Sequence, residues 1–376
     1  MSLIISTTAI CFVIVAFMVS TSRPTNAINP INGRQRQYSD IFFLMFAFAI
    51  TFMAAFRNGF QDTGVYKAIY STLELDYSYA FEESLDIQDY GFNLFMIFLK
   101  RINPDPQFLV IVTSVITFSI YFYVTKTYAQ NLPMTMLLLI TMDVIGAMNG
   151  IRQILAGALT LLGLPLLRDK KIIPYLLLVL LASTLHKSAM VLIPLYFIIS
   201  GKRMNLGIWA FLAFVVGSFM FPALADNIMG DLMEDSIYKT YLQNESSMGY
   251  MRFLVSLLPV ALVILYCWVQ QDNHDGENRT SSRYLHQRTV DVMINMTVVS
   301  FGFMTLGMRM VYFARVCLYF NCILAILIPS LISGIFRKSS VRAARILGFT
   351  FYLIFYLYQI YSYNRIGGWI GFTLNL

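Results

Sequence analysis

The sequence predicts an all-α, polytopic integral membrane protein with about twelve transmembrane helices. Of its 376 residues, 58% are hydrophobic and only 12% are charged, whereas soluble globular domains carry about 25% charged residues. The apolar residues fall in long runs, which a lipid bilayer can solvate and a single soluble core cannot bury. Tyrosine, with 23 copies, favours the headgroup region of a membrane. We therefore expect a single membrane domain over residues 1–376.

Long apolar runs predict the individual helices. A spanning helix needs about 20 apolar residues, within a range of roughly 17–25. The runs that approach this length are 3–20, 40–56, 106–125, 132–149, 152–168, 172–186, 188–200, 204–222, 251–270, 289–308, 316–336 and 346–362. Several between 150 and 200 are short, and we expect these to tilt little or to end at a cavity. The first run lacks a basic start and a clear cleavage site, which favours a retained helix over a signal peptide.

Basic residues predict the orientation of the bundle. They follow the first, fifth, seventh and eleventh runs, as Arg23, Arg34, Arg36, Arg168, Lys170, Lys171, Lys202, Arg203, Arg337, Lys338, Arg342 and Arg345. All lie on one side if the N-terminus is outside, and the positive-inside rule makes that side cytoplasmic. Both termini are then expected outside. The net charge of +7 reflects this topology and not nucleic-acid binding, because no basic stretch interleaved with aromatic residues is present.

The loops follow from this orientation. Residues 88–101 contain a short apolar stretch that ends in Lys100 and Arg101, and the orientation holds only if this segment does not cross. We expect an interfacial or re-entrant helix there, within an outer loop at about 57–105. A second outer loop is expected at 225–250 and a cytoplasmic loop at 271–288. An acidic run in the first outer loop is expected to be a solvated surface, and it comprises Glu82, Glu83, Asp86 and Asp89.

Arginines at the outer ends of the helices are the strongest functional signal. They are Arg57, Arg152, Arg252, Arg309 and Arg315. A single arginine of this kind is as often a snorkelling anchor as a ligand. Five on the side that the positive-inside rule disfavours are harder to explain as anchors. Because guanidinium groups bind phosphate oxygens bidentately and stay charged, the sequence predicts an outer cavity for an anion such as a lipid diphosphate.

Three other polar residues are candidates for chemistry. His186 lies between the sixth and seventh runs, and imidazole titrates near neutral pH, which suits a general base or a ligand as well as a purely structural role. Asp62 follows Arg57 by five residues and is the second candidate base. Asp143 lies within an apolar run, where a carboxyl group is either a buried ion-pair partner or a proton-coupling group.

Several function classes find no support in the sequence. The four cysteines lie in or beside apolar runs without a CxxC pair, so we expect neither a disulfide nor a metal site. The absence of a GxxxxGK[ST] motif argues against an ATP-driven pump. A transporter would need inverted repeats or broken helices at the midplane, and no internal repeat is apparent.

Three segments resemble the EpsG family of Wzy-like polysaccharide polymerases. FRNGFQDTGVY (56–66) is similar to its FR-x-G-x-D-x-x-Y pattern, although two residues separate Gly59 from Asp62 here. NGIRQILAGALTLLGLPLLRDKK and YLLLVLLASTLHKSAMVLIPLY (149–196) are similar to its Arg-Gln helix and its His-bearing helix pair. RMVYFARVCLYFNCILAILIP (309–329) is similar to its late arginine segment. The resemblance covers most of residues 50–330 in order and spacing.

The resemblance implies an inverting membrane glycosyltransferase with a GT-C-like bundle and an outward-facing cavity. Such enzymes polymerise undecaprenyl-diphosphate-linked oligosaccharide repeat units into O-antigen, capsule or exopolysaccharide at the outer, periplasmic face of the bacterial inner membrane. The expected partners are this lipid-linked substrate, membrane lipid and a possible chain-length regulator, with no nucleic acid. The alternatives are an O-antigen ligase-like transferase and a transporter or flippase of a lipid-linked sugar.

The resemblance also implies roles for individual residues. His186 and Asp62 are the candidate catalytic residues, in that order. The expected diphosphate ligands are Tyr66 and Gln153 together with the five outer arginines. No cofactor is expected, and no metal, because the sequence has no DxD motif and the arginines would stabilise the leaving group instead.

Overall fold

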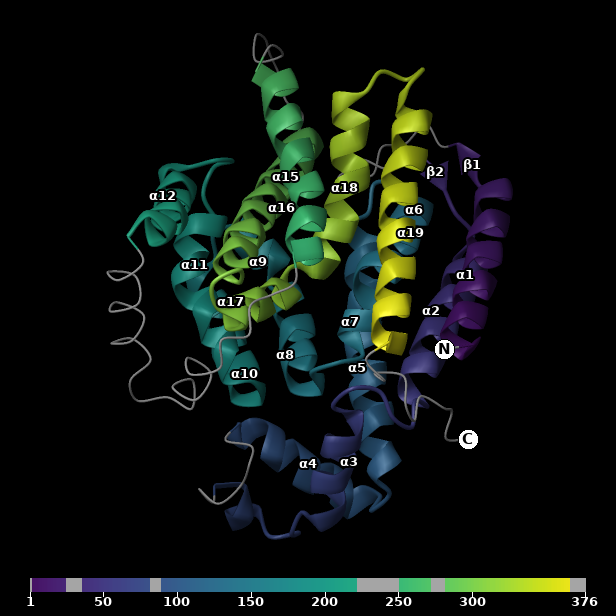
Figure 1. The fold of residues 1–376 in the computed structure, drawn as a ribbon, viewed down its shortest axis with the longest axis vertical. Coiled ribbons are helices and arrows are strands. Elements are labelled where there is room, and N and C mark those ends of the chain that lie inside the picture. Colours follow the sequence, from purple (N-terminus) through teal and green to yellow (C-terminus); the bar gives the residue numbers. More distant parts are fainter. Residues whose placement is uncertain (1, 25–35, 82–88, 222–249, 272–280, 366–376) are drawn as a thin grey trace.

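The computed structural model describes residues 2–24, 36–81, 89–221, 250–271 and 281–365 and is a helical bundle (Figure 1). Its elements are α1 (Ser2–Ser20), β1 (Arg23–Pro24), β2 (Arg36–Gln37), α2 (Asp40–Ala55), α3 (Thr63–Thr72), η1 (Tyr77–Phe81), α4 (Tyr90–Ile102), α5 (Pro106–Tyr128), α6 (Leu132–Leu139), η2 (Ile140–Val144), α7 (Ile145–Ala147), α8 (Ile151–Leu161), α9 (Leu164–Arg168), α10 (Ile172–Leu185), η3 (Lys187–Val191), α11 (Leu192–Ile199), α12 (Leu206–Met220), α15 (Tyr250–Gln271), α16 (Ser281–Leu306), α17 (Val311–Val316), η4 (Cys317–Tyr319), α18 (Asn321–Ile335) and α19 (Val341–Arg365). The helical fold class predicted from the sequence is confirmed.

A helix occupies each of the twelve predicted runs, but the helices differ in length. Among the described residues, α1, α5, α15, α16 and α19 are long and apolar enough to cross a membrane, and the bent pair of α17 and α18 could make a sixth span. The other apolar helices have 10–17 residues. These lengths support a multi-pass membrane protein, and about twelve complete crossings stay a prediction.

Local sequence signals set several helix starts. Asp105 caps α5 by accepting a hydrogen bond from the Gln107 N–H at 2.9 Å, with Pro106 as the first helical residue. Asn131 and Asn205 cap α6 and α12 in the same manner. A side-chain oxygen at this position satisfies an N–H that has no partner inside the helix. These caps place the starts of α5 and α6 within one residue of the predicted runs, and that of α12 within two.

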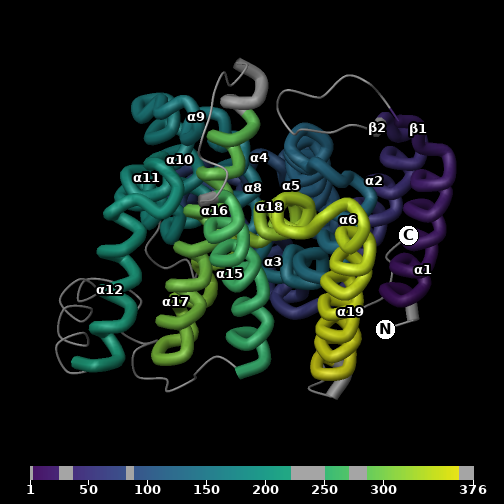
Figure 2. The backbone as a smooth tube through the Cα atoms, turned by 90° about the horizontal axis from the view of Figure 1, so that it is seen from above, coloured from purple at the N-terminus to yellow at the C-terminus, as the bar shows by residue number. Residues whose placement is uncertain are grey.

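The bundle is arranged around α5 and α18, which lie in its middle when seen from above, with α1 and α12 at opposite edges (Figure 2). Helix α5 packs against α2 and α8, and α18 packs against α6, α15 and α16. Helices α3 and α4 form a separate layer across one end of the bundle (Figure 1), where α3 contacts α5 and α4 contacts α10. Helix α4 covers the predicted segment 88–101, and its interfacial position stays a prediction.

The ends of the bundle separate the basic residues into two groups. Helix α1 begins and α19 ends toward the end that carries α3 and α4, whereas the β1–β2 pair and the α18–α19 connection lie at the opposite end (Figure 1). The predicted inner anchors Arg23 and Arg337 therefore lie far from Arg57. This arrangement agrees with the predicted orientation, whose sidedness stays a prediction. The predicted loop 225–250, except Tyr250, and residues 272–280 of the predicted loop 271–288 fall outside the described residues, whereas Ser281–Arg288 form the start of α16.

Two interruptions open the interior of the bundle. Helix α6 continues through the π-helical turn η2 into α7, and the chain then breaks at Gly150, whose φ of 69° is left-handed, before α8 begins. The segment α17–η4 meets α18 at an angle of 65°. π-Helical turns and breaks of this kind occur often at functional sites. Both interruptions border the same cavity.

Candidate functional site

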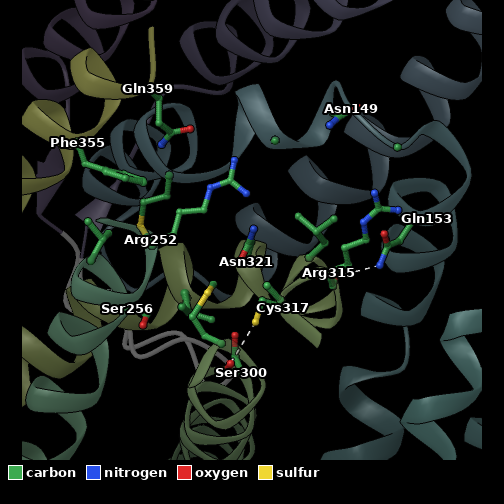
Figure 3. A pocket seen from close by; sticks show the side chains of 18 of the residues that line it. Asn149, Gln153, Arg252, Ser256, Ser300, Arg315, Cys317, Asn321, Phe355 and Gln359 are labelled. Atoms are coloured by element: carbon green, nitrogen blue, oxygen red, sulfur yellow. Dashed lines mark hydrogen bonds between the residues drawn. The ribbon is translucent and has the colours of Figure 1, made fainter. Parts of the chain in front are cut away.

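A cavity of about 350 Å³ lies where α8, α15, α17, α18 and α19 meet. Its polar wall includes Arg252 from α15, Arg315 from α17 and Asn321 from α18 (Figure 3). Further polar lining residues are Asp62, Asn149, Gln153, Ser256, Ser300, Gln359 and Tyr363, and the apolar ones include Met142, Val255, Met304, Leu324 and Phe355. We call this space the arginine cavity. A space with two guanidinium groups beside apolar side chains suits an anion attached to a lipid.

Hydrogen bonds hold the two arginines in the wall of the arginine cavity. The carbonyl oxygen of Arg315 accepts from Gln153 Nε2 at 2.9 Å, which ties α17 to α8. Arg252 lies 3.5 Å from the Tyr363 hydroxyl on α19. Arg252 and Arg315 are both exposed, and Figure 3 shows them on either side of Asn321. The Gln153 bond fixes the backbone of Arg315 and the Tyr363 contact involves the Arg252 guanidinium, and both side chains line the same space.

Asp62 lies at the edge of the arginine cavity in an unusual backbone setting. Its Oδ2 accepts the Gly150 N–H at 2.9 Å, and both Gly150 and the neighbouring Gln61 have left-handed φ angles, of 69° and 52°. A non-glycine residue in that region costs energy and often marks a functional site. Burial raises the pKa of Asp62, and the Gly150 N–H and the charges of Arg57 and Arg152 offset part of that rise.

A second group of polar side chains, which we call the Asp89 cluster, comprises Tyr66, Asp89, Arg152 and His186. Asp89 Oδ2 accepts from Arg152 Nη1 at 2.6 Å and from His186 Nδ1 at 3.0 Å. Its Oδ1 accepts the Lys187 backbone N–H at 2.9 Å. Arg152 Nε donates to the Tyr66 hydroxyl at 2.9 Å. One carboxylate therefore joins the arginine and the histidine that the sequence nominated separately.

The environment of Asp89 determines how His186 can act. Burial acts to raise the pKa of Asp89, but the His186 hydrogen bond and the charges of His186 and Arg152 outweigh it and hold the pKa below its usual value. Asp89 is consequently a carboxylate at neutral pH and can only accept. His186 must donate through Nδ1, which leaves Nε2 as the basic nitrogen. A carboxylate that fixes the tautomer in this way is the arrangement of a general-base dyad.

Close packing brings Asp89 to His186. A Cβ at Gly91 would overlap the Thr184 side chain, so only glycine lets the start of α4 approach the end of α10 this closely. The turn after His186 is in turn tied to the break before α18, since the Ser188 and Tyr319 hydroxyls lie 2.9 Å apart. With Arg152 and Gln153 adjacent on α8, the Asp89 cluster and the arginine cavity share one framework.

Arg57 is buried, and its guanidinium group is hydrogen-bonded to other residues of the protein. It is 2% exposed, and its guanidinium donates to Thr63 Oγ1 and Ser114 Oγ at 3.0 Å each and to the carbonyl oxygen of Ala54. It is not among the residues that line the arginine cavity. These contacts join α2 to α5 and to the start of α3, so the geometry gives Arg57 a scaffolding position.

We expect Arg57→Ala to lower the thermal stability of the protein in detergent, by the equivalent of roughly 2–4 kcal/mol, because buried groups lose charge-assisted hydrogen bonds. Arg101→Ala is the control, since Arg101 bonds the Leu75 carbonyl oxygen in an exposed position. An unchanged melting temperature together with a raised KM would instead make Arg57 a substrate ligand.

Arg309 lies apart from both groups. Its guanidinium donates to the Ser218 carbonyl oxygen and lies 5.9 Å from the centre of the Phe219 ring, both on or near α12. The outer arginines therefore do not meet in a single cavity. Arg252 and Arg315 line the arginine cavity with Asp62 and Gln153, Arg152 belongs to the Asp89 cluster with His186 and Tyr66, and Arg57 and Arg309 contact other parts of the bundle.

Two sequence-based interpretations of acidic residues need correction. Asp89, expected on a solvated surface, is 7% exposed and bonded to Arg152 and His186, because the packing of α4 on α10 buries it. Glu82, Glu83 and Asp86 lie outside the described residues. Asp143 is 1% exposed, as its apolar run predicts, but among the described residues it forms no ion pair. The ion-pair alternative for Asp143 is therefore wrong for the described part of the chain.

Several lining residues of the arginine cavity were missed from the sequence. Asn321 and Gln359 interrupt apolar runs, and a polar group at that depth is a signal for a cavity. Asn149 precedes the NGIRQ arginine and gave no separate signal. In the described residues, no group of three or more His, Cys, Asp or Glu side chains is placed to hold a metal ion.

Comparison with known proteins identifies the family. Residues 40–373 match the EpsG family, which extends the resemblance seen in three segments to most of the chain. No curated protein and no solved structure matches the chain. The chain belongs to the EpsG family, and this membership indicates a membrane protein with a function of the polysaccharide-polymerase type.

Proposed function

We propose that this protein is an inverting glycosyltransferase that polymerises undecaprenyl-diphosphate-linked oligosaccharide repeat units. The observation that carries the proposal is the pair Arg252 and Arg315 in one partly apolar cavity, on the same helical framework as a histidine held by a buried carboxylate. The reaction takes place at the outer face of the bacterial inner membrane, which is the side of α3 and α4, toward which α1 begins and α19 ends.

The growing glycan on the lipid diphosphate is the donor. Its diphosphate binds between Arg252 and Arg315, while the apolar lining of the arginine cavity receives the first part of the lipid chain. Negative charge grows on the diphosphate as the glycosidic bond breaks. Fixed guanidinium groups stabilise this charge more strongly in the transition state than in the bound substrate, which is the role that a divalent cation has in other glycosyltransferases.

A sugar hydroxyl of the next lipid-linked unit is the acceptor. Its oxygen attacks the anomeric carbon, a new C–O bond forms, and the bond to the diphosphate breaks with its electron pair on the leaving oxygen. His186 Nε2 takes the hydroxyl proton, and Asp89 stabilises the imidazolium that results. Arg152, which also donates to the Tyr66 hydroxyl, holds Asp89 in place, and Asp62 is the second candidate for the base.

The test is a reconstituted vesicle assay with a lipid-diphosphate-linked repeat unit as the only sugar substrate. We expect a ladder of products with increasing length, and we expect it to form in the presence of EDTA. A single transfer to a lipid A core would favour the ligase alternative. Movement of the lipid-linked unit across the vesicle membrane without any new glycosidic bond would favour the flippase alternative and refute the polymerase.

A further inference from the structure

Asp143 lies on the π-helical turn of the helix that leads into the arginine cavity, and the reaction above does not use it. It is 1% exposed, and neither of its carboxyl oxygens forms a close hydrogen bond in this structure, although Tyr121 and Asn321 face the group. In the described part of the chain, no Lys, Arg or His forms an ion pair with it. An unpaired carboxylate in an apolar interior is very costly, so Asp143 is an uncharged carboxylic acid.

The carboxyl group of Asp143 is next to a residue of the cavity wall. Tyr121 from α5 and Asn321 from α18 are the polar side chains that face it. Asn321 is the first residue of α18 after the 65° bend and lines the arginine cavity. Figure 3 shows its carboxamide between Arg252 and Arg315, with the nitrogen directed into the open space. Asn321 therefore connects Asp143 to the space between the two arginines.

We propose that Asn321 is a substrate-binding residue and that Asp143, as an uncharged acid, is the residue that positions it. This inference rests on the proposed function. When substrate binds, the Asp143 O–H, which forms no close hydrogen bond in this structure, donates to the Asn321 carbonyl oxygen and holds the two amide N–H groups toward the arginine cavity. A neutral donor between two cations suits an oxygen of the sugar that is attached to the diphosphate, because it binds that oxygen without adding charge.

The experiment is the vesicle assay with four variants. Each variant is first checked for folding by a single sharp gel-filtration peak in detergent. Asp143→Asn keeps an uncharged group of the same shape, and we expect its KM within about three-fold of wild type. Asp143→Leu and Asn321→Leu each lose the oriented donor, and we expect KM to rise about ten-fold, the effect of one hydrogen bond. The double variant should be no worse than Asn321→Leu alone, because both changes remove the same interaction.

Thr135→Val is the matched control, since Thr135 Oγ1 is also buried without a hydrogen-bond partner on the same helix but does not line the arginine cavity. Its KM should match wild type. Two results would overturn the inference while wild type still makes polymer. The first is an Asp143→Asn variant as impaired as Asp143→Leu, because the site would then need an ionised carboxylate. The second is an unchanged KM for Asn321→Leu. If wild type makes no polymer, the proposed function fails instead.

Discussion

Replacing either cavity arginine with alanine is expected to lower the rate of polymer formation by about 10²–10³-fold, the loss typical of one oxyanion-stabilising group. The effect should appear mainly in kcat, because the charge on the diphosphate is largest in the transition state. Arg315→Lys should recover only part of the activity, since an ammonium group keeps the charge but not the two-pronged geometry. The measurement is the initial rate of ladder formation in vesicles.

The control for the arginine variants is Arg101→Ala, which removes the same charge from the same end of the molecule. Arg101 contacts the Leu75 carbonyl oxygen and the Tyr77 ring and does not line the arginine cavity, so its rate should stay near wild type. Equal losses in Arg101→Ala and Arg315→Ala would mean that general surface charge matters and not the placement of two guanidinium groups.

Removal of the base is the second large effect. His186→Ala is expected to reduce kcat by about 10²–10⁴-fold. Asp89→Asn should have an effect of similar order, because an amide can donate to Nδ1 and so place the proton on Nε2, where it blocks base catalysis. Substrate binding in the arginine cavity should change little, since neither residue lines it. The readouts are kcat, KM and the pH dependence of kcat.

Asp76→Asn makes the same charge change in the same layer, at an exposed residue whose Oδ1 accepts from the Ser78 backbone N–H, and should leave kcat unaltered. Because the pKa of Asp89 is held below its usual value, Asp89 remains ionised above about pH 4. If wild-type activity falls as the pH is lowered toward that value, the loss therefore reflects protonation of a group other than Asp89. A kcat for Asp89→Asn equal to that of wild type would remove Asp89 and His186 from the chemistry.

The sequence predicted the helices well because hydrophobic length is a local property. The runs at 106–125 and 251–270 each correspond to one long helix, α5 and α15. The bend at Phe320 was not predicted, since Asn321 within the apolar run 316–336 does not by itself signal a bend, and the geometry depends on the packing of α17 against α16. The only sign of the break at Gly150 in the sequence was the boundary between the predicted runs 132–149 and 152–168.

The candidate site was predicted in part, for a physical reason that differs from residue to residue. Arg252 and Arg315 were found because a cation at that end of an apolar run is unexpected on topological grounds. Arg57 carries the same signal, yet its partners Thr63 and Ser114 are uncharged residues that no charge pattern reveals. Asp89 was missed because exposure of an acidic run is the usual outcome, and only the contact of α4 with α10 reverses it.

The position of α19 in the wall of the arginine cavity has a consequence for how the protein is made. Tyr352, Phe355, Gln359 and Tyr363 all come from α19, whereas Asp62 precedes α3, far earlier in the sequence. During synthesis the earlier helices enter the membrane while one wall of the arginine cavity is still absent. The nascent chain therefore has no complete site until α19 has left the ribosome and inserted into the membrane.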